Sequence, residues 1–195
     1  MPRTRTRTRT RTRTRTRTLV TSALLAALLA ASALIAIPIG AVPVTLQTLV
    51  VVLIALVCTP GQAAVALGLY LTLGIAGAPV FSGAQGGIAV LVGPTGGYLV
   101  GFALGAIAGA AVRVLLRGPA PARAAAAAAT VLVVVYAIGS LWLARITGSG
   151  LLSAVAGGVA PFVLLDAVKA AGAMAVATAL RRAGIADTPP GTDRV

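Results

Sequence analysis

The chain has 195 residues, of which 58% are hydrophobic and 10% are charged, and its mean hydropathy is +1.02. These values exclude a soluble globular domain of this size and indicate an integral membrane protein. Histidine and glutamate are absent, and the acidic residues are Asp166, Asp187 and Asp193, so histidine metal sites, Ser-His-Asp triads and paired glutamates are excluded.

The chain begins with a strict Arg-Thr repeat over residues 3–18. This tail holds eight of the sixteen basic residues, and without them the net charge of +13 falls to +5. Because the repeat has no apolar side chain to bury, we expect residues 1–18 to be disordered. The tail is either attracted to anionic lipids of the inner leaflet, serves only to orient the chain, or is an over-extended start of the reading frame.

Six charge-poor stretches are long enough to approach the ~30 Å hydrocarbon core as helices. The sequence Thr59-Pro60-Gly61-Gln62 separates the second from the third, because proline cannot donate a hydrogen bond inside a helix and glycine favours helix ends. One helix over residues 46–76 is the alternative and would reduce the count to five. The predicted helices cover residues 19–37, 44–58, 62–77, 95–116, 122–144 and 158–180.

The arginines outside the tail set the expected orientation. With the amino terminus inside, six spans place Arg113, Arg117 and Arg123 on the cytoplasmic side, together with Arg181, Arg182 and Arg194, and leave only Arg145 outside. This arrangement follows the positive-inside rule, whereas five spans would turn the loop between residues 117 and 123 outward. A cleaved signal peptide ending near residues 31–33 is the alternative for the first stretch.

Asp166 and Lys169 are the charges that lie deep inside a predicted span, and Lys169 is the only lysine. Their separation of three residues places them on one helical face, between the outer surface and the midplane. Charges inside a membrane cost several kcal/mol unless they are paired or hydrated, so they indicate a functional site. The alternative is a self-neutralising pair that only fixes helix packing.

Glycine recurs at every fourth position in the fourth predicted helix, at residues 97, 101, 105 and 109. This stripe predicts close internal helix packing. The first helix offers two similar small-residue stripes, Ser22/Ala26/Ala30 and Ala23/Ala27/Ala31. Glycine- and proline-rich loops near residues 40–48 and 79–98 are expected to cover a polar cavity on the side of Asp166, although simple connecting turns would have the same composition.

No G-x-x-x-x-G-K-[ST] loop is present, so this chain has no phosphate-cradling site for ATP hydrolysis. We therefore expect it not to be an enzyme, and any ATP-driven step to take place on another chain.

Three loop motifs resemble those of the BioY family, the biotin-specific S components of energy-coupling factor (ECF) transporters. They are Pro43-Val44-Thr45-Leu46-Gln47-Thr48, Gly77-Ala78-Pro79-Val80-Phe81 and Gly93-Pro94-Thr95-Gly96-Gly97-Tyr98. Asp166 and Lys169, after Pro161-Phe162, match an aspartate and a lysine in the last helix of the family. The chain departs from the family at Leu165, where a glycine is usual, and it lacks a pocket asparagine, for which Gln85 is the nearest amide.

The resemblance implies an all-α membrane protein with six transmembrane helices, in agreement with the six spans expected over residues 19–182 with both termini cytoplasmic. Residues 183–195 are expected to form a flexible tail. The resemblance also implies a subunit of the bacterial plasma membrane that captures biotin as transported substrate, without a cofactor or metal, and joins a transmembrane coupling protein and two ATPases. The alternatives are a stand-alone transporter and a structural membrane protein. The predicted substrate-binding residues are Asp166, Lys169, Gln85, Ser82, Gln47 and Tyr98, and the predicted docking residues are Ala23 and Ala27.

Biotin offers a carboxylate that needs a cation, a ureido group whose N–H groups need an acceptor, and an apolar ring and chain. Asp166, Lys169 and the surrounding apolar span supply all three kinds of partner. Which end of biotin meets which charge stays open from sequence.

Overall fold

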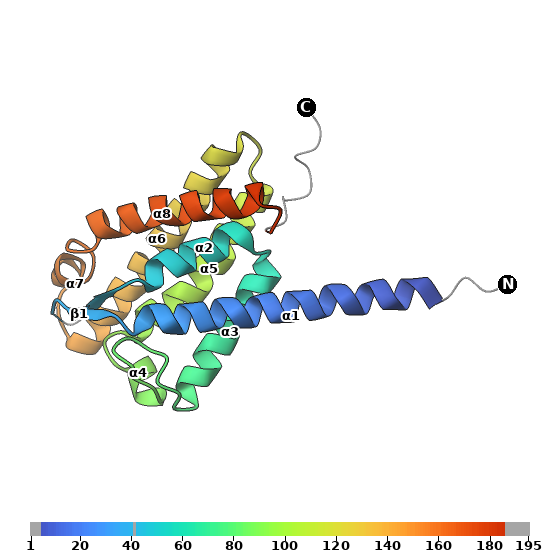
Figure 1. Ribbon diagram of the computed structural model, residues 1–195. Helices are drawn as coiled ribbons and strands as arrows, with labels where there is room; N and C mark the ends of the chain where they lie inside the picture. The colour runs from blue at the N-terminus through green and yellow to red at the C-terminus, as the bar shows by residue number, and fades with distance from the viewer. Residues whose placement is uncertain (1–4, 41, 186–195) are drawn as a thin grey trace.

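The computed structural model describes residues 5–40 and 42–185, and for residues 5–15 and 17 it describes the backbone only. Helices dominate the described chain (Figure 1). In chain order the elements are α1 (Arg5–Ala33), β1 (Ala36–Pro38), β2 (Pro43–Thr45), α2 (Gln47–Val57), α3 (Pro60–Ile75), α4 (Ile88–Val92), α5 (Gly96–Leu115), α6 (Ala120–Thr147), α7 (Leu151–Gly158) and α8 (Val163–Arg182).

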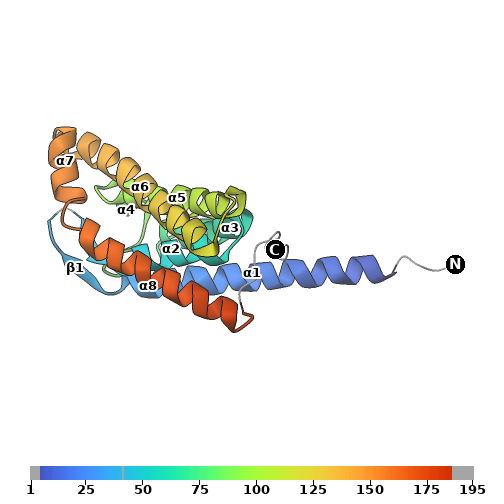
Figure 2. The same ribbon diagram turned by 90° about the horizontal axis from the view of Figure 1, so that it is seen from above.

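The short helix α2 lies at the centre of the bundle. It packs against α8, α5, α6 and α1, and Figure 2 shows it between α5 and α6 on one side and α1 and α8 on the other. Residues 50–56 of α2 are all buried, which is the pattern of a helix that is apolar on every face. Neighbouring helices therefore surround α2, and its two ends are the points where polar groups of different helices meet.

The glycine stripe of α5 packs directly against α6, as the sequence predicts. A Cβ added at Gly101 would lie 3.0 Å from Cα of Val135, and one added at Gly109 would lie 2.7 Å from Cγ2 of Val131. A Cβ at Gly97 would overlap the side chain of Trp142. The missing side chains let the two helix backbones approach closely, so α5 and α6 form the most extensive helix pair of the fold.

The predicted break between the second and third helices is confirmed. α2 ends at Val57 and α3 begins at Pro60. The Thr59 hydroxyl accepts from the Gln62 amide at 3.3 Å, and the Gln62 side chain accepts from the Thr59 amide at 2.9 Å. This reciprocal capping box, with proline at the first helical position, starts α3 at this point.

The first helix differs from its prediction at both ends. α1 begins at Arg5, so residues 5–18 are helical where a disordered tail was expected, and residues 1–4 lie outside the described residues. Arginine is a good helix former, so the apolar helix continues through the repeat despite its threonines. At the other end α1 stops at Ala33, four residues before the predicted end, because Ile37 precedes Pro38 and proline disfavours a helical conformation at the residue before it.

Residues after α1 form an antiparallel hairpin instead of more helix. Ile37 pairs with Val44, and Pro38 pairs with Pro43. The last helix also begins later than predicted, at Val163, because α7 and a turn at Val159–Phe162 precede it. The expected carboxyl-terminal tail begins with the turn after α8, and residues 186–195 lie outside the described residues.

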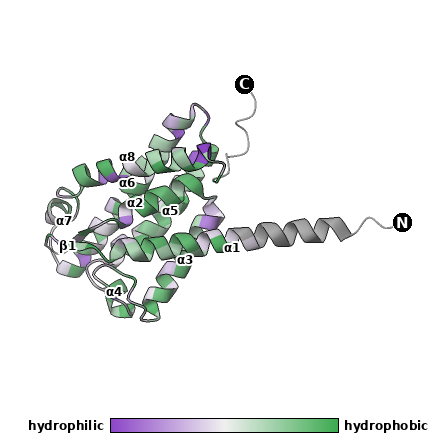
Figure 3. Cartoon of the chain, in the orientation of Figure 1, coloured by the Kyte–Doolittle hydropathy of each residue, from purple (hydrophilic) through white to green (hydrophobic). Residues whose placement is uncertain are grey.

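Three helices, α5, α6 and α8, are long and apolar enough to cross a membrane by length and composition. The apolar helices α2, α3 and residues 18–33 of α1 are shorter. Figure 3 shows that hydrophobic residues make up much of these helices. Large apolar side chains are exposed there, which is expected of surfaces in contact with lipid; examples are Leu24, Leu115, Val133, Leu152, Leu164 and Val168.

Candidate functional site

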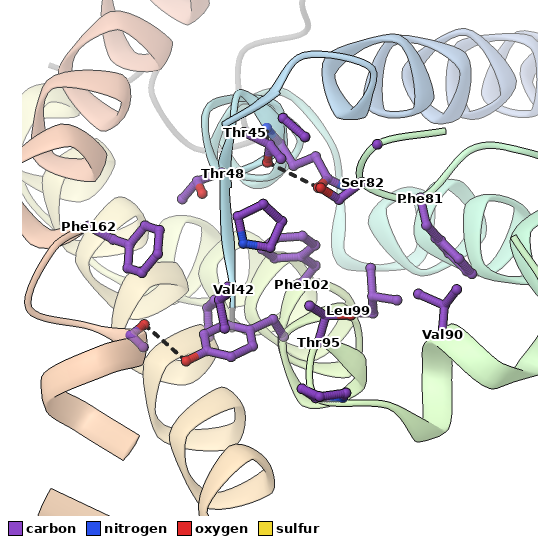
Figure 4. A pocket seen from close by; sticks show the side chains of 18 of the residues that line it. Val42, Thr45, Thr48, Phe81, Ser82, Val90, Thr95, Leu99, Phe102 and Phe162 are labelled. Carbon is purple, nitrogen blue, oxygen red and sulfur yellow. Dashed lines mark hydrogen bonds between the residues drawn. The ribbon is translucent and has the colours of Figure 1, made fainter. Parts of the chain in front are cut away.

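A cavity of about 630 Å³ lies at the end of the bundle where α2 and α8 begin. Its volume falls within the ~300 to 1,000 Å³ of small-molecule sites. The β1–β2 hairpin, the loop between α3 and α4, and the facing parts of α5, α6 and α8 form its walls. Figure 4 shows apolar side chains around it from several of these segments, among them Phe81, Val90, Leu99, Phe102 and Phe162.

Asp166 and Lys169 form an ion pair at the α8 wall. Lys169 Nζ lies 2.8 Å from Asp166 Oδ1, and the two side chains are 11% and 5% exposed. Asp166 lies in the first turn of α8, closer to the start of its helix than the predicted helix over residues 158–180 implies. The amino-terminal end of a helix favours a carboxylate there.

Tyr136 of α6 completes this polar group. Its hydroxyl donates to Asp166 Oδ2 at 2.7 Å, while Lys169 occupies the other carboxylate oxygen. Sequence reasoning missed Tyr136, although one signal was present: a tyrosine inside an apolar span needs a hydrogen-bond partner for its hydroxyl. The carboxylate is thus held in one orientation by groups from two helices.

Gln47 lies in the first turn of α2 and is 3% exposed. Its side-chain Nε2 donates to Tyr70 Oη at 2.6 Å, and its Oε1 accepts from Thr45 Oγ1 at 3.0 Å. Thr48 joins Thr45 and Gln47 in the cavity wall. These residues fasten the hairpin to the beginning of α2, so Gln47 has a structural role in addition to lining the cavity.

Tyr98 lines the cavity from α5, but its hydroxyl is already used. It donates to the carbonyl of Gly158 at 2.9 Å, and a Cβ at either Gly139 or Gly158 would overlap the tyrosine side chain. The ring therefore fills a slot between α6 and the end of α7. Tyr98 acts as a fixed wall of the cavity.

Ser82 and Gln85 line the cavity from the loop between α3 and α4. The Ser82 hydroxyl oxygen is buried and has no hydrogen-bond partner within the described residues. The loop is closed by main-chain bonds between Phe81 and Gln85, at 2.9 and 3.3 Å, and the Gln85 residue is exposed. All six sequence-predicted substrate-binding residues therefore lie in the wall of one cavity.

The two predicted docking residues lie elsewhere, on α1. Ala23, Ala27 and Ala31 are exposed, whereas Ser22 and Ala26 of the neighbouring stripe are buried. Ser22 donates to the carbonyl of Gln62 in α3. The structure thus separates the two stripes that the sequence left equivalent, since one packs inside the bundle and the other faces outward.

Known proteins share both the sequence pattern and the fold of this chain. The sequence model of the BioY family matches residues 5–185. A protein of Pyrococcus horikoshii described as a probable biotin transporter is 39% identical over 82% of this chain and 93% of its own length. A biotin transporter of Lactococcus lactis subsp. cremoris is 42% identical over 76% of this chain and 81% of its own length.

The fold has a solved counterpart. The crystal structure of the S-component for biotin from an ECF-type ABC transporter superposes with a TM-score of 0.80. It shares 24% sequence identity, and the match covers 87% of this chain and 93% of that chain. Together, the family match over nearly the whole chain, the identity to two biotin transporters and the shared fold show that this protein belongs to the BioY family.

Proposed function

We propose that this chain is the biotin-binding, substrate-capturing membrane subunit of an ATP-driven vitamin uptake system. One observation carries the proposal: the cavity of about 630 Å³ has apolar walls and places one ion pair, Asp166 with Lys169, among them. Such a cavity suits a ligand with an apolar ring and chain and a few polar atoms. Membership of the BioY family supports the choice of biotin.

The ion pair binds the ureido end of biotin. Lys169 Nζ and Asp166 Oδ1 are 2.8 Å apart, so they meet a ligand at one point, whereas the valeryl chain separates the carboxylate of biotin from its ureido group by several bonds. A ureido group presents an N–H donor next to a C=O acceptor, which pairs with both residues at once. A carboxylate at the same point would be attracted by Lys169 and repelled by Asp166.

The carboxylate of biotin then points toward the loop between α3 and α4. Ser82 offers a buried hydroxyl without a partner in the described chain, and Gln85 lies at the same wall with an exposed side chain. Both groups can donate to a carboxylate, and such charge-assisted hydrogen bonds are stronger than neutral ones. Tyr98 and the aromatic residues of the wall contact the ring and the chain.

The chain crosses the bacterial plasma membrane six times, with both termini cytoplasmic. The described part contains six helices of at least 11 residues, α1, α2, α3, α5, α6 and α8. The cavity lies at one end of the bundle, and Arg113, Arg123 and Arg181 lie at the other. Under the positive-inside rule, this distribution supports a cavity that faces outside and arginines that face inside.

The outward stripe of α1 is the docking face for a transmembrane coupling protein that works with two ATPase subunits. Ala23 and Ala27 are exposed and small, so a partner helix could approach the α1 backbone closely. The chain has no phosphate-binding loop of its own, which is why the ATPases must be separate subunits.

Equilibrium binding with a panel of vitamins tests the proposal. The purified full chain should bind biotin and leave thiamin and riboflavin unbound at the same concentrations. Binding of another vitamin in preference to biotin would contradict the assigned substrate, and no binding would favour a structural membrane protein. Biotin uptake in a host that lacks the coupling ATPases would instead favour a stand-alone transporter.

A further inference from the structure

Three arginines meet at the end of the bundle opposite the cavity. Arg113 lies near the end of α5, Arg123 in the first turns of α6, and Arg181 near the end of α8. We call them the arginine cluster. In Figure 1 these helix ends lie on the side away from α7 and β1, and Figure 3 shows hydrophilic residues there.

Two members of the cluster contact the end of α2. Arg113 is 5% exposed; its Nε donates to the carbonyl of Ala55 at 3.1 Å and its Nη2 to that of Cys58 at 2.7 Å. Arg181 Nη1 lies 3.5 Å from the carbonyl of Leu56. These contacts satisfy carbonyls that the end of a helix leaves without intrahelical partners.

Capping alone does not account for the charge of the cluster. A helix carboxyl-terminal end is equivalent to roughly half a negative charge, whereas the cluster carries three positive charges. Arg113 is subject to electrostatic repulsion from both Arg181 and Arg123. Within the described residues the sole carboxylate side chain belongs to Asp166, which lies at the other end of α8 and is paired with Lys169.

The arginine cluster also has N–H donors that have no hydrogen-bond partner in the part of the chain that the structure describes. The Nε of Arg123 is buried and has no hydrogen-bond partner within the described residues. A guanidinium group carries five N–H donors, and the contacts of Arg113 and Arg181 use a minority of theirs. Three cations from three helices thus combine an excess of positive charge with unused donors, one of which is already removed from solvent.

We propose that the arginine cluster binds the phosphate group of an anionic phospholipid. Guanidinium groups bind phosphate oxygens through paired hydrogen bonds, and α5 and α8, both long enough to cross a membrane, end at the cluster, which places it at headgroup depth. Under the proposed orientation the lipid belongs to the inner leaflet, where anionic lipids attract basic groups between helices. The orientation decides only the leaflet; lipid binding does not depend on biotin binding or on ATPase partners.

The test uses the purified full chain in nanodiscs of phosphatidylcholine with increasing phosphatidylglycerol, and counts retained lipid by native mass spectrometry. The parent protein should retain phosphatidylglycerol in preference to phosphatidylcholine. Arg123→Gln should weaken this retention roughly tenfold, as expected for the loss of a charge-assisted hydrogen bond. Arg117→Gln is the matched control, because Arg117 is exposed in the loop between α5 and α6 and is outside the cluster; it should behave like the parent.

Several outcomes would overturn the proposal. Equal retention of the two lipids, or equal loss in Arg117→Gln and Arg123→Gln, would reduce the cluster to general surface charge. If inorganic phosphate stabilised the protein thermally in pure phosphatidylcholine as much as phosphatidylglycerol does, the ligand of the cluster would be a free anion. Lipid retention that appears only after Asp187→Asn with Asp193→Asn would mean that the chain's own acids occupy the cluster. Unchanged lipid retention in that double variant supports the phospholipid as the ligand of the cluster.

Discussion

Tyr136 of α6 donates its hydroxyl to Oδ2 of Asp166 on α8 at 2.7 Å. α6 and α8 share few other contacts, and both residues line the cavity. The hydrogen bond therefore joins two walls of the site and leaves Asp166 with one orientation in which to meet a ligand.

Removing this hydroxyl should weaken biotin binding without unfolding the protein. A hydrogen bond to a charged group contributes about 1.5 to 3 kcal/mol, so Tyr136→Phe should lower biotin affinity roughly ten- to a hundredfold. Isothermal titration calorimetry measures the change. Thr130→Val is the control, because Thr130 lies on the same helix and its hydroxyl bonds only to the carbonyl of Ala126 in that helix. Equal affinities for the parent and Tyr136→Phe would remove Tyr136 from the site.

Biotin binding should require both members of the ion pair, Asp166 and Lys169. Lys169→Met and Asp166→Asn each leave one buried charge without its partner, which typically costs about 3 to 5 kcal/mol of folding stability. Each variant also removes one of the two groups assigned to the ureido group, so biotin affinity should fall roughly ten- to a hundredfold. The double variant Asp166→Asn with Lys169→Met should recover thermal stability and still fail to bind biotin. If the double variant binds normally, the pair serves helix packing alone.

The end of biotin that meets this pair can be identified with a neutral analogue. Because the ureido group is assigned to Asp166 and Lys169, biotin methyl ester should bind the parent within about tenfold of biotin and should lose affinity in Lys169→Met. Competition against labelled biotin gives both values. An ester that binds poorly to the parent and is indifferent to Lys169→Met would place the carboxylate at Lys169.

Close packing of α5 on α6 should make the glycine stripe sensitive to a single methyl group. A Cβ at Gly109 would lie 2.9 Å from the carbonyl oxygen of Ala127, whereas one at Gly68 in α3 has nothing within 4 Å. Overpacking costs typically about 1 to 3 kcal/mol, so Gly109→Ala should lower the melting temperature. Gly68→Ala should leave it unchanged or raise it, since alanine favours helix over glycine. Equal melting temperatures would contradict the close contact.

A larger side chain on the outward face of α1 should block biotin uptake without weakening biotin binding. Ala27→Leu should leave biotin binding by the purified chain unchanged and abolish uptake in cells that contain the coupling protein and ATPases. Ala129→Leu is the matched control, because Ala129 is an exposed alanine on α6. Full uptake by Ala27→Leu would move the docking face to another surface.

Cysteine labelling in intact cells tests the orientation of the chain in the membrane. Cysteine in place of Ala120, at the start of α6, should react with an impermeant maleimide only after the membrane is permeabilised, while Ser153→Cys on α7 should react from outside. Both positions are exposed, and the native Cys58 is buried. Labelling of the Ala120 position from outside would reverse the proposed topology.

Sequence patterns predicted much of this fold because they reflect local physics. The break at Thr59-Pro60 follows from proline and from a capping box within four residues, and the function of the glycine stripe follows from its spacing along one helix. The Asp166–Lys169 pair could be predicted for the same reason, since residues three apart on a helix lie on the same face.

Other features depend on contacts between distant segments. No local pattern distinguishes the buried Ser22 and Ala26 from the exposed Ala23 and Ala27, because only the position of α3 decides which stripe is covered. Tyr136 meets Asp166 from thirty residues away. The hairpin was missed although Ile37 and Val42 each precede a proline, which favours extended backbone.

The length of α2 sets the depth of the proposed substrate site. Its 11 residues, at about 1.5 Å each, extend roughly 16 Å, about half of the ~30 Å hydrocarbon core. Gln47 and Thr48, in the first turn, belong to the cavity wall, so a bound solute rests on top of this short helix. Under the proposed six-span topology, a molecule held there would lie about halfway through the apolar barrier, with the length of one short helix between it and the inner surface.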